Sequence, residues 1–377
     1  MRRTQLLILG AGPFGLSMAA YARQNGLDFL HLGRPCDFWK NNMPRGMFLR
    51  SGIDWQLDPR GEFSLERFVR EQDIRAYSPL PLDIYWQYLD WFMTMTRLDP
   101  LPVLVRMLRR SGQGFLAELE DGTSIEARQV VLATGFRYFA HFPEALVRRL
   151  PPGRFSHTCT TVDPAPWAGQ RLLILGGRQS AFETAAIFRE NGVGPIHLSY
   201  RHDTPRFEEA DWTWVSALID RVEHNPAWFR NLPAAEKEAY RYKFWAEGRL
   251  KIEPWLESRI AQPHIVLHPR TELLHSRVLK NNALQVELSN QKSIEVDHIL
   301  LATGYQVQVR NLPFLDPGLL DAIRTDHGYP VLDEHFQSSV PGLYASSFMA
   351  TQDFGPFMAF TISAPMAARL IGKHLKA

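Results

Sequence analysis

The chain has 377 residues, enough for about two domains that each bury a core. Hydrophobic residues make up 45% of it and charged residues 22%, which is ordinary for a soluble enzyme. A net charge of +2 without a basic stripe argues against a nucleic-acid partner, and no apolar run reaches the roughly eighteen residues that a membrane span requires. The two cysteines, Cys36 and Cys159, form no C-x-x-C pair, which indicates a reducing cytoplasm and excludes dithiol exchange.

The N-terminal residues predict a parallel strand, a glycine turn and a helix. Four aliphatic residues, Leu6–Leu9, form a run that is too short for a helix, and residues 16–23 follow with a helical pattern. Between them, the spacing G-x-G-x-x-G is given by Gly10, Gly12 and Gly15. Such glycines allow a tight turn, close approach of a pyrophosphate, and packing of the helix on the strand. With a second strand over residues 28–32, the unit predicts dinucleotide binding.

The basic first residues and the apolar run after them also imitate a secretory signal peptide. A signal peptide requires neither the glycine spacing nor the second strand. The strand–helix–strand interpretation explains more of the sequence, so we expect the N-terminus to be part of a cytoplasmic protein's fold.

Two segments of the chain recur later in it. Residues 172–181 repeat the pattern of residues 6–15, and both copies continue into a double alanine. Residues 287–305 nearly repeat residues 118–136. In both segments, strands of alternating polarity flank a turn, and a hydrophobic strand ends in Ala-Thr-Gly. Because the matching pairs occur in the same order at nearly the same offset, they indicate two dinucleotide-binding units.

The predicted fold is α/β, with two Rossmann-like dinucleotide-binding domains, the second inserted into the first. We expect the first domain over residues 1–155, the second over 160–285, and the completion of the first over 286–377; a tandem of independent domains is the alternative. A helical insertion rich in aromatic residues is predicted at about 206–260. It is interpreted either as a packed cap or oligomer contact, or as a lid over a substrate pocket.

This arrangement resembles the NAD(P)H-dependent flavin monooxygenases with two dinucleotide-binding domains, including the N-hydroxylating single-component and Baeyer–Villiger groups. Several stretches are most similar to the FAD-dependent urate-hydroxylase-like oxidoreductases: Gly10–Ala20, Phe38–Met47, Gly176–Glu183 and Phe354–Phe357. The resemblance implies that the first domain holds FAD and the second holds NADPH.

The resemblance also assigns residues to FAD. Those expected at the pyrophosphate are Gly10, Gly12, Pro13, Phe14 and Gly15, and those expected at the flavin or its strand-end loop are Trp39, Met47, Leu49, Thr134, Gly135, Asp353, Phe354, Gly355, Pro356 and Phe357. Asp353 is alternatively a surface or capping carboxylate. Where the family places an acidic residue for the ribose, this chain has Gly33 and then Arg34, so we expect backbone groups or Arg34 to hold the ribose.

The residues assigned to NADPH are Gly176, Arg178, Gln179, Ser180, Ala181, Arg201 and Gly304. Arg178 occupies the place of the central glycine, where a left-handed backbone would cost about 1–2 kcal/mol. Either its guanidinium binds the phosphates, or the unit binds its nucleotide poorly. Arg201 follows the second strand of this unit and favours the 2′-phosphate of NADPH over NADH, unless it is a solvated surface arginine.

The resemblance implies that NADPH reduces FAD and that a C4a-(hydro)peroxyflavin transfers one oxygen atom of O₂ to a small nitrogen-containing or aromatic substrate. Catalytic residues are not identified; Arg50 and Gln56 are candidates for anchoring an anionic substrate and hydrogen-bonding the flavin, with structural duty as the alternative. The histidines have no metal-ligand spacing, so no metal is expected.

Two other functions stay open at this point, namely a flavin oxidoreductase or quinone-type reductase without oxygen insertion, and a non-catalytic nucleotide sensor. A homo-oligomer is compatible with the sequence, and no membrane partner is expected.

Overall fold

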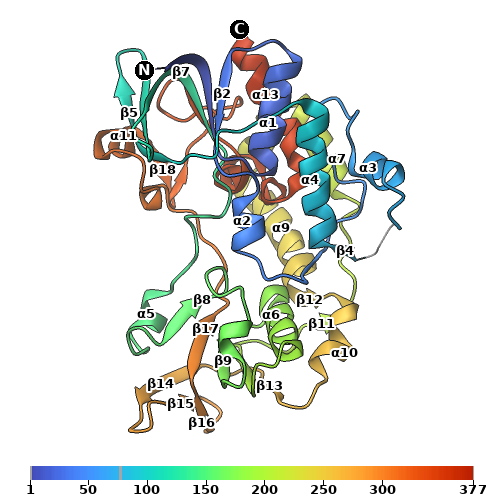
Figure 1. Ribbon diagram of the computed structural model, residues 1–377, viewed down its shortest axis with the longest axis vertical. Helices are drawn as coiled ribbons and strands as arrows, with labels where there is room; N and C mark the ends of the chain where they lie inside the picture. Colours follow the sequence, from blue (N-terminus) through green and yellow to red (C-terminus); the bar gives the residue numbers. More distant parts are fainter. Residues whose placement is uncertain (1, 76–78, 377) are drawn as a thin grey trace.

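The computed structural model describes residues 2–75 and 79–376, and two sheets organise it (Figure 1). The sheet of the first unit comprises β1 (Arg2–Leu9), β2 (Phe29–Leu32), β5 (Val105–Ser111), β6 (Gly114–Leu119), β7 (Ser124–Leu132) and β20 (Leu343–Ala345). Strands β2, β1, β7 and β20 are parallel, whereas β5, β6 and β7 form an antiparallel meander. The early half of β7 pairs with β6, and its last three residues pair with β20.

The second unit repeats this plan around a five-stranded parallel sheet. In spatial order its strands are β13 (Ile265–His268), β10 (Ile196–Ser199), β9 (Leu172–Leu175), β17 (His298–Leu301) and β8 (Phe155–His157). A separate antiparallel meander consists of β14 (Leu273–Val278), β15 (Leu284–Leu288) and β16 (Ser293–Val296). Each unit therefore runs strand, helix, strand and meander, as the internal repeat predicts.

The boundary expected at residue 286 is wrong. Strand β17 pairs with β9 inside the second sheet, and the meander before it belongs to the same unit. The second unit therefore extends to Leu301, and it begins with β8 at Phe155 rather than at residue 160. The reason is the repeat itself, because the Ala-Thr-Gly strand that closes each unit must pair with that unit's own first strand.

The helices of the first unit are α1 (Pro13–Gln24), α2 (Asp37–Asn41), α3 (Leu65–Glu71), α4 (Leu82–Thr96), α11 (Pro317–Ala322), α12 (Thr351–Phe354) and α13 (Ala364–Lys376). The short helix α5 (Glu144–Val147) instead lies beside β8 and packs on the core of the second unit. Helix α1 begins after Gly12 with Pro13 in its first turn, where the missing N–H is not needed. It packs on α13, where a side chain at Gly372 would overlap the ring of Tyr21. Glycine at this crossing lets the two helices approach closely.

The second unit contains α6 (Gln179–Glu190) and the helical insertion. The insertion comprises α7 (Val215–His224), α8 (Trp228–Asn231), α9 (Ala234–Trp245), the π-helix η2 (Ala246–Leu250) and α10 (Glu257–Ile260). Val215, Val222 and Phe244 of the insertion belong to the hydrophobic core of the first unit. Helices α7 and α9 therefore leave the second unit in sequence and pack against the first in space (Figure 1), whereas Ile260 of α10 stays in the core of the second unit.

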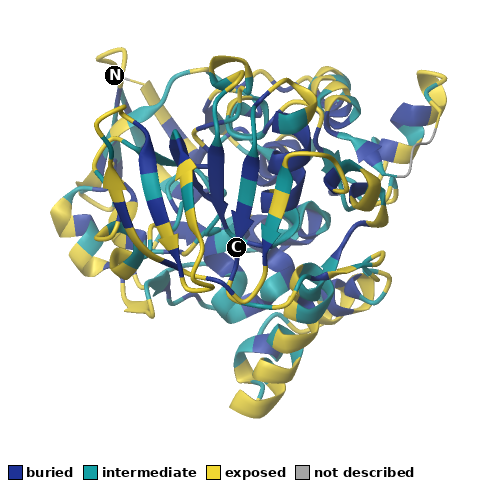
Figure 2. Cartoon of the chain, turned by 90° about the horizontal axis from the view of Figure 1, so that it is seen from below, coloured by how far each residue is buried: buried dark blue, intermediate teal, exposed yellow. Residues whose placement is uncertain are grey.

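Short elements complete the chain. The small strand pairs are β3 (Phe48–Leu49) with β4 (Leu80–Pro81), β11 (Arg206–Phe207) with β12 (Lys251–Ile252), and β18 (Thr325–Asp326) with β19 (Tyr329–Pro330). The 3₁₀ turns are η1 (Ala165–Trp167), η3 (Pro254–Leu256), η4 (Val309–Asn311), η5 (Ser347–Ala350), η6 (Pro356–Ala359) and η7 (Thr361–Ser363). Buried residues lie along the central strands, and exposed residues lie on outer helices and loops (Figure 2).

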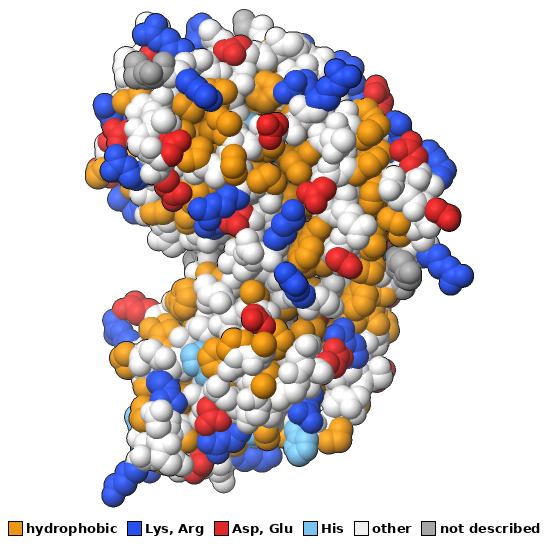
Figure 3. Space-filling model, in the orientation of Figure 1, with side chains coloured by type: hydrophobic (Ala, Val, Ile, Leu, Met, Phe, Trp, Pro, Cys, Tyr) orange, Lys and Arg blue, Asp and Glu red, His pale blue; other side chains and the backbone are white. Residues whose placement is uncertain are grey.

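The space-filling view shows two lobes with an indentation between them, and acidic and basic side chains are interspersed over this face (Figure 3). Within residues 2–75 and 79–376, no helix has the length and apolar content to cross a bilayer.

Two glycines of the first turn should respond differently to the same added methyl group. A Cβ at Gly15 would overlap the carbonyl oxygen of Gly10, whereas a Cβ at Gly12 has no heavy atom within 4 Å. Gly15→Ala should therefore lower the free energy of unfolding by about 3 kcal/mol, and Gly12→Ala should leave it nearly unchanged. Chemical denaturation of both variants measures the difference. Equal losses would contradict this account of the turn.

Candidate functional site

A cavity of about 950 Å³ is lined by residues from both units. It opens at the carboxyl ends of the parallel strands, where the glycine turns after β1 and β9 lead into α1 and α6. Ligands of open α/β sheets bind at this edge, next to helix N-termini that carry partial positive charge. Both predicted phosphate-binding turns therefore lie on one cavity.

The first turn is shaped to admit a phosphate group. Only glycine fits at position 10, because φ is +113° and a side chain would overlap the carbonyl oxygen of Ala133. Gly12 faces open space. The buried ring of His31 donates Nε2–H to the carbonyl oxygen of Gly10 (2.9 Å), and burial lowers the pKa of His31 to about 4. A neutral imidazole thus holds the backbone of the turn through this hydrogen bond.

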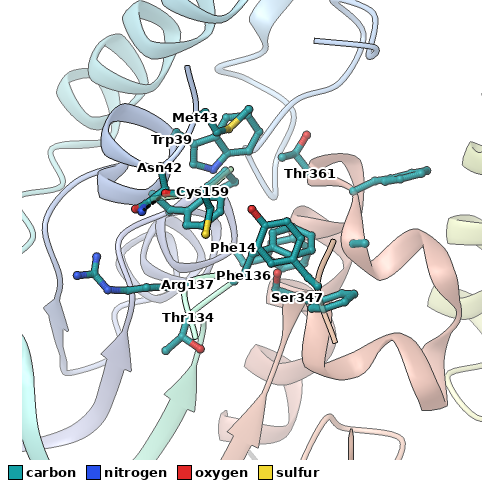
Figure 4. Close-up of a pocket in the computed structure, with 18 of the residues that line it drawn as sticks. Phe14, Trp39, Asn42, Met43, Thr134, Phe136, Arg137, Cys159, Ser347 and Thr361 are labelled. Carbon is teal, nitrogen blue, oxygen red and sulfur yellow. Dashed lines mark hydrogen bonds between the residues drawn. The ribbon is translucent and has the colours of Figure 1, made fainter. Parts of the chain in front are cut away.

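The loop after β7 supplies polar groups to the same wall (Figure 4). Thr134 lines the cavity, and its buried Oγ1 has no hydrogen-bond partner among the described residues. Arg137 pairs with Asp37 of α2. The exposed Arg34 lies 3.8 Å from Glu120, a distance at which a ligand can compete for its guanidinium.

The left-handed backbone expected at Arg178 is wrong. Arg178 is extended (φ −116°, ψ −179°) and caps α6, while Gly176 takes the positive φ of +149°. The Arg178 guanidinium turns away from α6, donates to the carbonyl oxygen of Arg249, and lies 5.4 Å from the ring centroid of Trp245. An arginine therefore fits this turn without backbone strain.

Cationic side chains gather around the second turn. Partial burial and the charge of Arg249 lower the pKa of Arg178 to about 10. Desolvation of its guanidinium and the charge of Arg50 lower the pKa of Arg249, although the residue as a whole is exposed. Burial, with Arg178 and Arg201 nearby, lowers the pKa of His202. The mutual repulsion of these groups would be relieved by an anion such as a phosphate.

A buried carboxyl group lies on the helix that follows the second turn. Glu183 of α6 is 1% exposed, lines the cavity, and accepts a hydrogen bond from the backbone N–H of Phe48 in β3 (2.8 Å). Burial raises the pKa of Glu183 to about 7, although Arg259 and Arg50 oppose the shift. The sequence analysis assigned no role to this residue; its only signal was an acid on the inward face of the helix after the second turn.

Most residues predicted to bind cofactors line this cavity. They are Gly10, Gly12, Pro13, Phe14, Arg34, Trp39, Met47, Leu49, Thr134, Gly135, Arg178, Gln179, Ser180 and Pro356. Predicted residues outside the lining are Gly15, Gly176, Ala181, Arg201, Gly304, Asp353, Phe354, Gly355 and Phe357. Gly15 and Gly176 shape the turns from behind, and Arg201 is exposed beyond β10.

The C-terminal segment lies differently from the expectation. Phe354 and Phe357 are fully buried in the core, where Phe354 stacks on Phe336 with ring centroids 3.6 Å apart. The carboxylate of Asp353 accepts from the backbone N–H of Leu332 (2.8 Å), which is a structural contact. The residues of this segment that reach the cavity are Pro356, Ala359, Phe360 and Thr361.

Arg50 lines the cavity, but its guanidinium is occupied. Arg50 Nε donates to Glu253 (2.6 Å), and its Nη atoms reach the carbonyl oxygens of Gly248 and Glu247 at 3.2 and 3.3 Å. Arg50 therefore joins the loop after β3 to the insertion, which matches the structural alternative. Gln56 lies outside the lining and has a buried Oε1 without a partner among the described residues.

Further lining residues were not assigned from the sequence. Phe136, Tyr305 and Phe348 cluster, with the Phe136 centroid 5.0 Å from that of Tyr305 and 4.6 Å from that of Phe348. Cys159 lies beside them with Sγ 3.0 Å from His157 Nδ1, and burial raises the pKa of its thiol. Both cysteines are buried and free. In the described parts of the chain, no three His, Cys, Asp or Glu side chains are placed to hold a metal ion.

Comparison with known families agrees with this geometry. The profile of the pyridine nucleotide-disulphide oxidoreductase family matches residues 4–230, which is more than half of the chain. The chain belongs to this family. Membership confirms the predicted oxidoreductase class and the dinucleotide-binding fold.

One curated relative and two solved structures are similar to the chain. The FAD-dependent urate hydroxylase of Xanthomonas campestris is 25% identical over 335 residues, covering 80% of this chain and 68% of that protein. The ornithine N-hydroxylase of Kutzneria sp. 744, solved with reduced FAD, NADP⁺ and L-ornithine, has a TM-score of 0.78 at 14% identity and covers 99% of both chains. The FAD-bound cadaverine monooxygenase of Erwinia amylovora has a TM-score of 0.75 at 19% identity, covering 100% and 95%. The predicted resemblance to flavin monooxygenases is confirmed.

Glu183 should make stability depend on pH. Because its pKa is about 7 in the folded chain and ordinarily 4.5, the protonated carboxyl contributes stability that is complete below about pH 4.5 and lost as the pH rises through about 7. Glu183→Gln cannot ionise, so it should gain about 2 kcal/mol relative to the wild type between about pH 5 and about pH 8.5.

Denaturant unfolding at both pH values measures this gain. Glu236→Gln, at an exposed position of α9, is the control and should follow the wild type. Parallel pH dependence of Glu183→Gln and the wild type would contradict the assignment.

Proposed function

We propose that the chain is an FAD-dependent monooxygenase that uses NADPH and transfers one oxygen atom of O₂ to a small nitrogen-containing or aromatic substrate. The observation that carries the proposal is the opening of two phosphate-binding turns into one cavity. That arrangement allows a flavin and a nicotinamide to meet within one water-poor site. The relatives named as monooxygenases or hydroxylases support oxygen transfer as the outcome.

The residues of the first unit fit FAD. Gly12 leaves room for a pyrophosphate at the N-terminus of α1, and a side chain at Gly33 would crowd the backbone N–H of Ala11. Thr134 Oγ1 has no hydrogen-bond partner among the described residues, and Arg34 lines the cavity near the first turn, where it could bind the ribose of FAD. Trp39, Met47 and Leu49 supply an apolar wall for the ring system.

The residues of the second unit fit NADPH. Ser180 and Gln179 place the N-terminus of α6 on the cavity, and the cationic cluster beside it includes Arg178, Arg201 and Arg249. An arginine at the end of the second strand suits a 2′-phosphate. This cluster supports NADPH rather than NADH.

When bound, FAD would supply hydride acceptance from NADPH and activation of O₂. The chain itself would orient FAD and NADPH and exclude water from the cavity. The aromatic lining at Phe136, Tyr305 and Phe348 favours the exclusion of water. Glu183 lines the cavity, and because burial raises its pKa to about 7, its carboxyl group can hold or release a proton near neutral pH.

A screen of NADPH oxidation tests the proposal. Urate, L-ornithine and cadaverine are the first compounds, because the relatives' names contain them. A true substrate should stimulate NADPH oxidation and receive one labelled atom from ¹⁸O₂, with peroxide measured to correct for uncoupling. NADPH oxidation without labelled product would instead establish a flavin reductase, and a colourless protein that refuses added FAD would contradict both functions.

Gly12→Val should abolish FAD retention without unfolding the chain. The Cβ position at Gly12 is open, so the fold tolerates the larger side chain, which then occupies the place of the pyrophosphate. Flavin absorbance per polypeptide measures retention, and circular dichroism checks the fold. A folded variant with full flavin content would refute the assignment.

Arg201→Ala should raise the KM for NADPH about tenfold and leave the KM for NADH unchanged, because one charge-assisted phosphate contact is lost. Arg206→Ala, which removes another exposed arginine of this region, should change neither value. Steady-state kinetics with both coenzymes measures the effect. Equal changes for the two coenzymes would remove Arg201 from 2′-phosphate recognition.

A further inference from the structure

One helical face of the insertion forms a continuous side of the cavity. The lining residues of α9 and η2 are Arg241, Phe244, Trp245, Gly248 and Arg249. All five line the same cavity, so they form one stripe that continues from the α-helix α9 into the π-helix η2. Acidic Glu247, on the same element, instead accepts from Lys251 (2.8 Å) and from the backbone N–H of Asp211 (2.9 Å). The stripe therefore presents cations and aromatic rings to the cavity.

The two ends of this stripe contact different parts of the protein. Arg249 lies beside Arg178 at the second turn. Arg241 lies at α12, where its Nη2 is 3.4 Å from Gln352 Oε1 and its Nη1 is 3.9 Å from Glu238. These contacts are long, so the Arg241 guanidinium keeps most of its hydrogen-bonding capacity. Eight residues separate Arg241 from Arg249, which places their Cα atoms about 12 Å apart along the helix axis.

Aromatic rings fill the space between the ends. Trp212 of the insertion and Phe360 of the C-terminal segment lie with centroids 4.9 Å apart, and Phe244 is 5.6 Å from Phe360. Trp55 adds a fourth ring, 5.5 Å from Phe360. All four line the cavity. Such a wall favours a planar ring in the ligand.

The charged side chains of the lining leave no free carboxylate that could pair with an alkylammonium group of a substrate. Among the described lining residues, the acids are Asp37 and Glu183, against the arginines Arg34, Arg50, Arg137, Arg178, Arg241 and Arg249. Asp37 is paired with Arg137, and the carboxyl of Glu183 is turned to the backbone N–H of Phe48. A cationic amine would therefore enter a site of its own charge without a free carboxylate.

We propose that the α9–η2 stripe is the substrate-recognition surface and that the substrate is a planar ring compound with an anionic group bound by Arg241. This proposal rests on the proposed function, because it takes the cavity as the substrate site. It separates this chain from enzymes that act on aliphatic diamines or basic amino acids. Arg249, at the opposite end of the stripe, would bind the pyridine nucleotide.

Three ring probes that differ in charge test the proposal: benzoate, benzamide and benzylamine. Calorimetric titration of the FAD-loaded protein should give benzoate the highest affinity and benzylamine the lowest, at least about tenfold apart. In Arg241→Gln, the advantage of benzoate over benzamide should disappear. Arg241→Lys should retain most of it, and the exposed Arg206→Gln should retain all of it.

Tightest binding of benzylamine, an unchanged benzoate preference in Arg241→Gln, or no binding of any probe would overturn the proposal. Reduction of the flavin by NADPH, measured on the same preparations without any probe, reports separately on the proposed function. Intact reduction with the wrong order of affinities counts only against the anionic substrate. Loss of reduction in the wild type counts against the oxidoreductase chemistry itself.

Discussion

The structure depends on one close backbone contact that occurs twice. The glycine that follows β1 and the glycine that follows β9 each pack against the carbonyl oxygen of the alanine of an Ala-Thr-Gly loop, Gly10 against Ala133 and Gly176 against Ala302. A side chain at either glycine would overlap that oxygen. The contact brings the strand-end loop over the N-terminus of the following helix, so turn and loop form a single wall. This is the physical reason that two motifs more than a hundred residues apart recur together.

The two turns have the same backbone plan but different side chains around them. Gly12 leaves the head of α1 bare, and nearby Thr134 offers only a hydroxyl group. At the head of α6, Arg178 and its cationic neighbours replace that open space with positive charge. An open turn leaves phosphate binding to backbone groups, whereas guanidinium groups beside the turn can add charge-assisted hydrogen bonds to a phosphate.

The sequence predicted the two units, their order and the two glycine turns that lie on the cavity, because glycine spacing and strand periodicity are local signals. It misplaced the boundary at residue 286 because β17 pairs with a strand more than a hundred residues earlier. Phe354 and Phe357 were expected at the cofactor but lie in the core, since an aromatic run does not reveal which rings face inward. Glu183 and Arg241 escaped assignment because their environment is built by segments distant in sequence.

The insertion makes the two units mechanically dependent on each other. Its chain leaves the second unit, yet Phe244 is locked among Trp212, Trp214 and Phe357 in the core of the first. Any swivel of one lobe against the other must either unpack these rings or drag α9 along its own axis. A helix is stiff along its axis, so a displacement of η2 beside α6 would also displace the end of α9 that lies beside α12.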